Sequence, residues 1–321
     1  MAVDGPAHAL ALTTTSEALT TSTTELAATR EISRVALVTC SRLPDLDPDD
    51  RLLLDPLRAR GVTADVVAWD EPAADWAAYD LVVLRSAWDY APRRDAFVAW
   101  AEGVTTLANP ADVVTWNTDK RYLRDLAKAG VPVIPTTFVE PGGGWLAPGT
   151  DVVVKPAVGA GSVDAGRYEL AAGPEAFEAH VRRLLDAGRT VMLQPFQRAI
   201  QEAGETALVY LGGGEGLRFS HAARKGAMLT GPDEGVTGLY KEERIDPAEA
   251  SAAQRAVAER ALDAVPGGRD RLLYARVDLV PDDSGAPTLI ELELAEPSLF
   301  LGQAAGAAER FADAVTGALA R

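Results

Sequence analysis

Cysteine is almost missing from this sequence, because only Cys40 is present among 321 residues. One cysteine cannot form an internal disulfide, so a disulfide-stapled fold is excluded and a reducing compartment is indicated. Long apolar runs are also missing, and the first residues lack the basic start and apolar core that are typical of a secretory signal. We therefore expect a globular cytoplasmic protein without a membrane segment.

Basic residues are scarce relative to acidic ones. The 31 lysines and arginines are outnumbered by 47 aspartates and glutamates, which gives a formal net charge of −16. Non-specific nucleic-acid binding needs the opposite balance, because lysines and arginines must displace counterions from phosphates. Nucleic acid is therefore excluded as a partner class, whereas a small polyanion bound in one lysine-lined cleft stays open.

Aromatic residues are missing from residues 1–30, which are rich in alanine, threonine and serine. Such a segment cannot bury enough apolar surface to offset the entropy lost on ordering. We expect a disordered tail here. The remaining length suffices for two or three subdomains with substantial cores.

Strands and helices alternate downstream of the tail. Strands are expected at residues 35–39, 64–67 and 81–84, with a helix at 52–60, which predicts a small parallel sheet. Ligands of open α/β sheets bind beyond the carboxyl ends of strands. The stretch after the third strand therefore supplies candidate substrate residues: Arg85, Ser86, Trp88, Asp89 and Tyr90. For the two aromatics, packing under a following helix at residues 93–102 is an equally good interpretation.

Two lysines occupy positions that are unfavourable for a cation. Lys120 lies in the first turn of a helix predicted over residues 116–129, where the helix dipole disfavours positive charge. Lys155 interrupts an apolar strand at residues 151–156, and a buried lysine needs a partner. The loop after this strand contains Gly159, Gly161 and Ser162, and its backbone N–H groups can approach phosphate oxygens. Together these features predict an anion site, although the glycine spacing is not that of a P-loop.

Residues 274–280 and 288–294 alternate in residue type with a period of two, and a Pro/Gly-rich turn joins them. This pattern predicts an antiparallel strand pair with Arg276, Asp278, Glu291 and Glu293 on one face. Two carboxylates about 4 Å apart repel each other by about 4 kcal/mol at a near-surface dielectric, so we expect a cation between them. Carboxylate oxygens without cysteine or histidine favour Mg²⁺ shared with nucleotide phosphates.

The alternative is an edge hairpin whose acidic face is only solvated. We disfavour it because apolar residues alternate with the charged ones and imply a sheet packed on its other side. These apolar residues are Val277, Leu279, Ile290, Leu292 and Leu294.

The remaining elements are predicted from periodicity and caps. Strands are expected at residues 190–195, 206–211 and 219–223, and helices at 174–187, 247–265 and about 300–319. For the second of these helices, Asp246 is the predicted N-cap and Pro247 the first helical residue.

In their order and spacing, these motifs resemble the ATP-grasp superfamily of carboxylate ligases. The resemblance covers nearly everything after the tail. R-V-D at residues 276–278 is similar to the D-alanine–D-alanine ligases, while R-S-A-W-D-Y and E-L-E-L-A-E-P-S-L resemble a group that includes the O-ureido-D-serine cyclo-ligase of cycloserine biosynthesis. One departure is Glu293, because many members have Asn there; a Glu should still bind Mg²⁺.

The resemblance implies an α+β ATP-grasp fold. A small Rossmann-like α/β substrate domain at residues 31–115 would precede an ATP-grasp small lobe at 116–196 and a large lobe with the metal site at 197–321, both lobes having antiparallel sheets.

The resemblance also implies an ATP-dependent ligase that releases ADP and phosphate. A small amino-acid-like carboxylate would attack the γ-phosphorus, and an amine would attack the resulting acyl phosphate, with Arg276 and Arg224 stabilising charge. Two Mg²⁺ ions, with Mn²⁺ as an alternative, would bind Asp278, Glu291 and Glu293. ATP would contact Lys120, Lys155, Gly159, Gly161, Ser162, Gln194, Pro195, Phe196, Glu202 and Glu205, with Glu202 preferred over Glu205 for the ribose.

Three alternatives remain open. An intramolecular cyclo-ligase competes with an intermolecular amino-acid or peptide ligase, and the residues do not separate them. A non-catalytic ATP-binding module is disfavoured because the phosphate and metal positions are all filled. A homodimer is compatible with the sequence.

Overall fold

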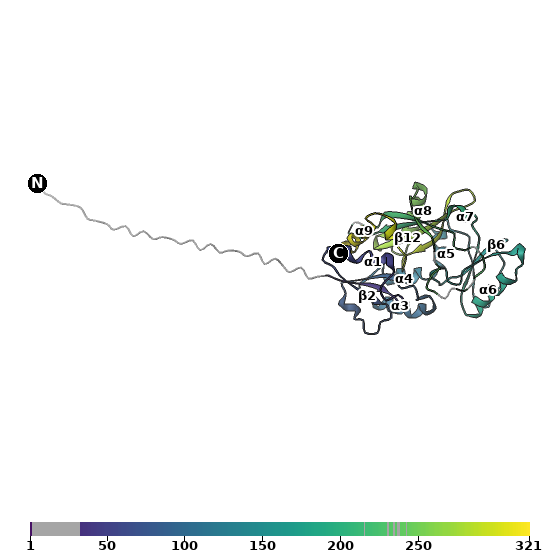
Figure 1. The fold of residues 1–321 in the computed structure, drawn as a ribbon, viewed down its shortest axis with the longest axis horizontal. Coiled ribbons are helices and arrows are strands. Elements are labelled where there is room, and N and C mark those ends of the chain that lie inside the picture. Colours follow the sequence, from purple (N-terminus) through teal and green to yellow (C-terminus); the bar gives the residue numbers. More distant parts are fainter. Residues whose placement is uncertain (2–32, 215, 230, 234, 236–237, 242) are drawn as a thin grey trace. The chain divides into compact units, whose positions relative to one another are not determined.

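The computed structural model describes residues 1, 33–214, 216–229, 231–233, 235, 238–241 and 243–321 (Figure 1). The chain divides into two units, Met1–Glu31 and Ile32–Arg321. The helices and strands of the described residues all belong to the second unit. The tail predicted at residues 1–30 lies, apart from Met1, outside the described residues.

The first sheet is parallel and has the strand order β2-β1-β3-β4. Its strands are β1 (Arg34–Thr39), β2 (Thr63–Ala68), β3 (Leu81–Ser86) and β4 (Leu107–Ala108). The helices that accompany them are α1 (Pro48–Arg51), α2 (Leu54–Ala59) and α3 (Arg94–Gly103). Five of the six residues of β1 are buried, as is typical of a parallel strand covered on both faces. The predicted α/β arrangement is confirmed.

The second sheet is antiparallel, with the order β5-β8-β6-β7. Its strands are β5 (Thr137–Val139), β6 (Asp151–Pro156), β7 (Gly166–Glu169) and β8 (Val191–Pro195). Helix α6 (Glu175–Asp186) buries Phe177, Val181, Leu184 and Leu185 against it. The strand predicted at 151–156 has the observed bounds.

The third sheet is antiparallel, with the order β11-β10-β9-β12-β13. Its strands are β9 (Glu205–Leu211), β10 (Arg218–Lys225), β11 (Ile245–Ala248), β12 (Tyr274–Pro281) and β13 (Pro287–Glu293). The short helix α7 (Ile200–Ala203) precedes β9. Helix α8 (Ala252–Asp263) packs on one face of this sheet.

The other face of the third sheet changes character along its length. At one end Val209, Leu211 and Tyr274 pack against Phe311 of α9 (Ala307–Leu319). Because side chains two residues apart share a face, Arg276 and Asp278 follow Tyr274 on the same side. The fold therefore buries one end of this face under a helix and leaves its charged end to line a cavity.

The helix predicted over residues 116–129 is wrong as a single element. The structure has α4 (Ala111–Asn117) and α5 (Tyr122–Lys128), with a break between them. Asn117 Nδ2 donates to Leu292 O at 2.8 Å, and the backbone N–H of Lys120 donates to Ala157 O at 2.8 Å. These bonds to β13 and to the end of β6 replace the helical pairing, so Lys120 is not in a first helical turn.

The helix predicted at residues 247–265 also begins elsewhere. Residues 245–248 form strand β11, which pairs with β10, so Asp246 is not an N-cap. The cap of α8 is Ser251, whose Oγ accepts from Gln254 N while Gln254 Oε1 accepts from Ser251 N, a capping box. The final helix, predicted from about residue 300, starts at Ala307.

Candidate active site

A cavity of about 500 Å³ lies among the three sheets and the loops that join them. Most of the predicted site residues line it: Trp88, Tyr90, Lys120, Lys155, Gly159, Gly161, Ser162, Gln194, Pro195, Phe196, Glu205, Arg276, Glu291 and Glu293. Asp278 lies beneath these, with no exposed surface. The chain therefore brings together segments that are far apart in the sequence.

Strands β12 and β13 set the acidic centre. Arg276 pairs with Glu293 and Asp278 pairs with Glu291 across the two strands, so all four side chains share a face, as predicted. One oxygen from each of Asp278, Glu291 and Glu293 lies within 4.8 Å of the others. This set of three hard oxygen donors suits a divalent cation such as Mg²⁺.

A β-bulge next to these carboxylates corrects one prediction. The register shifts between Asp278 and Leu279, so Leu279 pairs with Leu289 and Ile290 is the extra residue. Ile290 consequently leaves the apolar face that holds Leu292 and packs against Ile134 and other apolar residues near the cavity. The alternation of residue type does not reveal the bulge.

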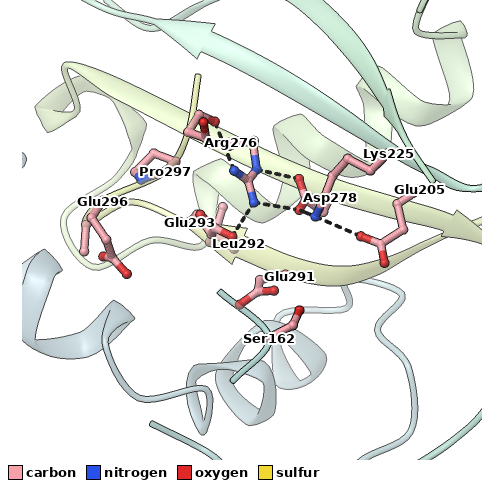
Figure 2. A network of polar contacts seen from close by, with 12 residues as sticks. Ser162, Glu205, Lys225, Arg276, Asp278, Glu291, Leu292, Glu293, Glu296 and Pro297 are labelled. Atoms are coloured by element: carbon pink, nitrogen blue, oxygen red, sulfur yellow. Dashed lines mark hydrogen bonds and ion pairs between the residues drawn. The ribbon is translucent and has the colours of Figure 1, made fainter. Parts of the chain in front are cut away.

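Two buried cations hold the acidic centre together (Figure 2). Arg276 donates to Asp278 Oδ1 from Nε at 2.9 Å and also contacts Glu293. Lys225 Nζ lies 2.9 Å from Asp278 Oδ2 and 3.1 Å from Glu205 Oε2. Asp278 is thus neutralised from two sides, whereas Glu291 and Glu293 are directed into the cavity.

The three carboxylates differ in acidity. Burial alone would raise the pKa of Glu291, but the charges of Lys120 and Lys155 lower it to about 2. The pKa of Asp278 is also lowered, because Arg276 and Lys225 outweigh burial. Burial raises the pKa of Glu293 to about 8, with Arg276 opposing the rise and Glu291 adding to it. A cation at this centre would favour ionised Glu293, so the donor set fits a metal.

The two lysines predicted from the sequence face Glu291 from the other wall. Lys120 Nζ lies 3.1 Å from Glu291 Oε1 and donates to Gly159 O at 2.6 Å. Lys155 has no hydrogen-bond or ion-pair partner within the described residues, and its pKa is lowered by burial, with Glu291 opposing. An unpaired cation beside a glycine loop is suited to a phosphate ligand.

The glycine loop is packed under residues 239–241. Gly161 has φ of +60°, and a Cβ at that position would lie 2.4 Å from Leu239 O and 2.7 Å from Tyr240 Cα. The backbone N–H of Lys241 donates to Gly161 O at 3.1 Å. Tyr240 also meets Trp88 edge-on at 5.1 Å between ring centroids. Only glycine satisfies both the backbone conformation and the close approach.

Three of the five predicted substrate residues do not line the cavity. Arg85 is fully buried and pairs with Asp50 at 2.9 Å, and Ser86 donates to the same carboxylate. Asp89 accepts from Trp69 Nε1 and Arg93. The prediction that Arg85 anchors a substrate carboxylate is therefore wrong, since its charge is already used inside the fold.

Two further predicted residues also lie outside the cavity lining. Glu202 is exposed on α7, whereas Glu205 lines the cavity. Arg224 donates to Ala203 O, and its neighbour Lys225 reaches the acidic centre instead. Adjacent residues of a strand point to opposite faces, and the sequence alone did not indicate which of the two basic residues faces inward.

The sequence reasoning missed Lys225, Lys241 and Glu296 as cavity residues. The sequence does place Lys225 at the end of a predicted strand, directly after Arg224, which is the residue that the sequence analysis assigned to the site. Glu296 lies in the E-L-E-L-A-E-P-S-L segment, three residues beyond Glu293, where the strand has ended and periodicity no longer predicts direction.

Comparison with known proteins finds related sequences. Residues 35–109 match the family described as D-cycloserine synthetase DcsG, N-terminal domain. The chain is 41% identical over 297 residues to the cycloserine biosynthesis protein DcsG of Streptomyces lavendulae, which covers 88% of this chain and 97% of that protein.

Solved structures show the same fold. The crystal structure of D-cycloserine synthetase DcsG superposes with a TM-score of 0.78 at 38% identity, covering 89% of this chain and all of that one. The ATP-grasp ligase PsnB, solved with a precursor variant, Mg and ADP, gives a TM-score of 0.58 at 21% identity, covering 90% of this chain and 99% of that one. The predicted α+β ATP-grasp fold is confirmed.

Proposed function

We propose a substrate and residue roles from one premise: the chain belongs to the D-cycloserine synthetase DcsG family of ATP-grasp ligases. It is an ATP-dependent ligase that forms a carbon–nitrogen bond. The substrate we propose is O-ureido-D-serine, an amino-acid-like carboxylate whose own nitrogen closes the ring. The similarity to DcsG over nearly the full length of both chains supports this choice.

One observation carries the proposal: the acidic centre and the two lysines share a single cavity. Transfer of a γ-phosphoryl group requires that charge be neutralised on the distal phosphates. Lys120 and Lys155 would contact phosphate oxygens, and Gly159, Gly161 and Ser162 would offer backbone N–H groups. The adenine would lie against residues 194–196, which form the end of β8 and the residue after it and line the cavity.

Magnesium would be held by Asp278, Glu291 and Glu293. The site would take one or two ions, and Mn²⁺ is the alternative metal. When bound, the metal neutralises the β- and γ-phosphate oxygens of ATP and so makes the γ-phosphorus easier to attack. Of the two glutamates considered for the ribose hydroxyls, Glu205 is the better candidate because it lines the cavity.

The reaction would begin with attack of the substrate carboxylate on the γ-phosphorus, which releases ADP and leaves an acyl phosphate. Attack by the nitrogen then forms the carbon–nitrogen bond and expels phosphate. Arg276, which lines the cavity beside Glu293, would stabilise the negative charge that develops on the carbonyl oxygen. Trp88 and Tyr90 would bound the substrate end of the cavity.

The test is a product analysis with substrate labelled by ¹⁸O in its carboxylate. The expected products are ADP and phosphate carrying one ¹⁸O, together with a cyclic product of lower mass than the substrate. AMP and pyrophosphate, or unlabelled phosphate, would contradict the acyl phosphate. A linear conjugate of two substrates would indicate an intermolecular ligase, and ATP binding without turnover would indicate a non-catalytic module.

Two further predictions concern the compartment in which the enzyme acts and its oligomeric state. None of the helices in the described part of the chain is long and apolar enough to cross a membrane. Because the reaction consumes ATP, we place it in the cytoplasm. A homodimer stays a prediction, which sedimentation of the purified protein tests.

A further inference from the structure

The segment after β13 is held in an unusual way: five consecutive carbonyl groups each accept a hydrogen bond from a side chain. The pairs are Tyr274 Oη to Ala295 O at 2.8 Å, Trp88 Nε1 to Glu296 O at 2.9 Å, Arg85 Nη2 to Pro297 O at 2.6 Å, Arg276 Nη1 to Ser298 O at 3.0 Å and His221 Nε2 to Leu299 O at 2.8 Å. A segment outside a sheet ordinarily leaves such groups to water.

The five donors come from three parts of the fold, which fixes the segment in position. Arg85 and Trp88 belong to β3 and the loop after it, Tyr274 and Arg276 to β12, and His221 to β10. Arg85 is itself fixed by Asp50 and has no exposed surface. Its buried charge therefore serves to position the backbone of residues 295–299.

Two residues of this fixed segment line the cavity, Glu296 and Ser298, and Glu296 is the one that carries a carboxylate. Figure 2 shows its carboxylate on the far side of Glu293 from Lys225 and Glu205. Tyr90 and Trp88 line the same cavity, and Tyr90 lowers the pKa of this carboxylate. Among the described residues, Glu296 is not part of the group of carboxylates close enough to share a metal. It lies at the end where the substrate would bind.

The other carboxylates at this end are occupied by the backbone. Asp49 accepts from Leu301 N at 2.8 Å and from Gly302 N at 2.7 Å. Asp47 caps α1 by accepting from Asp49 N at 2.9 Å. Both carboxylates are thus engaged by backbone N–H groups of other residues, whereas Glu296, which lines the cavity, can offer an oxygen to a substrate.

We propose that Glu296 is a catalytic residue that accepts the proton of the nitrogen that attacks the acyl phosphate. In this step the carbon–nitrogen bond forms, the bond from carbon to the phosphate oxygen breaks, and phosphate leaves with that electron pair. The proton moves from nitrogen to a carboxylate oxygen of Glu296, so atoms and charge balance. The inference rests on the proposed function, since it needs an acyl phosphate and an N–H nucleophile.

The electrostatic setting suits this role. Burial raises the pKa of Glu296 to about 7, while Lys120 and the Tyr90 hydrogen bond oppose the rise and Glu291 adds to it. A general base works best when its pKa is near the working pH, where it is ionised in part and still takes up a proton readily. An ordinary exposed glutamate, with a pKa of about 4.3, would be a weaker acceptor.

The test separates the two chemical steps in Glu296→Gln. Turnover to the cyclic product should fall by a factor of about 10² or more, the usual contribution of a general base. Formation of the acyl phosphate should persist, seen as a single-turnover release of ADP and as a hydroxamate when hydroxylamine is added. Hydroxylamine is a strong nucleophile at neutral pH and does not need the base. Glu102→Gln, an exposed site on α3, is the matched control and should behave as the parent.

Three outcomes would overturn the proposal: unchanged product formation, an equal loss of ADP release, or a raised KM with unchanged kcat, which would make Glu296 a binding residue only. If the parent releases no ADP with the substrate, the proposed function fails first. A second variant guards against misfolding. Tyr90→Phe removes the hydroxyl group that lowers the pKa of Glu296, so the acid limb of the pH profile of kcat should move to higher pH. An unmoved limb would count against the role of Glu296.

Discussion

Among the cations that line the cavity, Lys155 is the one that has neither an ion pair nor a hydrogen bond within the described residues. Removing it while keeping its length, as in Lys155→Met, should weaken ATP binding by a factor of about 10 or more, the value of one lost charge-assisted contact. The melting temperature without ligand should stay the same or rise, because a desolvated charge is removed. Calorimetry with a non-hydrolysable ATP analogue and thermal melts measure the two effects.

Lys128→Met is the control for this variant, because Lys128 is exposed on α5 and, in the part of the chain that the structure describes, pairs with Asp125 alone. It should change neither quantity. Unaltered nucleotide affinity in Lys155→Met would contradict the assignment of Lys155 to a phosphate.

Glu293 makes the metal-free enzyme sensitive to pH. Its pKa is raised to about 8 in the folded protein, against about 4.3 in an unfolded chain. Between these values the folded state holds a proton that the unfolded state has released, so stability falls as pH rises through this window. With chelator present, the free energy of unfolding of the parent should therefore decline more steeply from about pH 5 to pH 8 than that of Glu293→Gln.

Mg²⁺ should reduce the difference between the two proteins, because it binds the ionised form of Glu293. Urea titrations at several pH values, with chelator and with Mg²⁺, provide the comparison. Parallel curves for the parent and the variant in chelator would mean that Glu293 does not hold the extra proton.

At the scale of the elements, regular periodicity in the sequence predicted the strand pairing correctly. Alternation with period two placed Arg276, Asp278, Glu291 and Glu293 on one face, because pairing between β12 and β13 preserves that face over most of its length. The sequence pattern does not reveal the bulge at Ile290, because the bulge changes the face on which a side chain lies without changing the type of residue.

Prediction from local patterns failed where tertiary bonds replace regular pairing. The helix over residues 116–129 is broken because Asn117 binds the backbone of β13, a contact 175 residues away in the chain. Arg85 at a strand end was expected to bind substrate, but Asp50 takes its charge inside the fold. Both outcomes depend on distant partners that periodicity, caps and spacing do not report.

The glycine loop between β6 and β7 is the element whose shape most directly tests the ATP site. Gly161→Ala would place a methyl group within 2.4 Å of Leu239 O at a φ of +60°, so the loop or residues 239–241 must move. We expect weaker ATP binding, and slower ADP release in a single turnover, with little loss of stability because the loop is partly exposed.

Gly149→Ala is a suitable comparison, because a Cβ there would meet no atom within 4 Å and its φ is not positive. It should match the parent in both assays. Parental ATP affinity in Gly161→Ala would show that the loop does not close on phosphate in this conformation.

At the scale of the whole folded unit, the first sheet and the third sheet share one core. Val35 and Leu37 of β1 belong to the same buried cluster as Val209 and Leu211 of β9 and Phe311 of α9. The substrate end of the cavity, which both parts line, is therefore built on a common apolar base. We expect residues 33–321 to unfold in one cooperative transition rather than domain by domain.

Asn109 supplies the polar counterpart of this shared core. Its Nδ2 donates to Tyr274 O at 2.9 Å and Leu294 O at 2.6 Å, and its Oδ1 accepts from Leu273 N at 2.8 Å. All of these groups are buried, so loss of the amide leaves three backbone groups unpaired, at about 1 kcal/mol each or more.

Asn109→Gly should consequently lower the free energy of unfolding by about 3 kcal/mol. Asn109 has a φ of +52°, and glycine tolerates that conformation, so this variant removes the hydrogen bonds without adding backbone strain. Asn109→Ala should cost about 1 kcal/mol more, because alanine does not favour a left-handed conformation.

Urea unfolding followed by tryptophan fluorescence and by circular dichroism gives both values. The lost bonds join the end of β4 to β12 and β13. The fluorescence transition, to which Trp69, Trp76 and Trp100 of the core beside the first sheet contribute, should then precede the loss of sheet signal. Coincident transitions at parental stability would show that Asn109 does not couple the two parts.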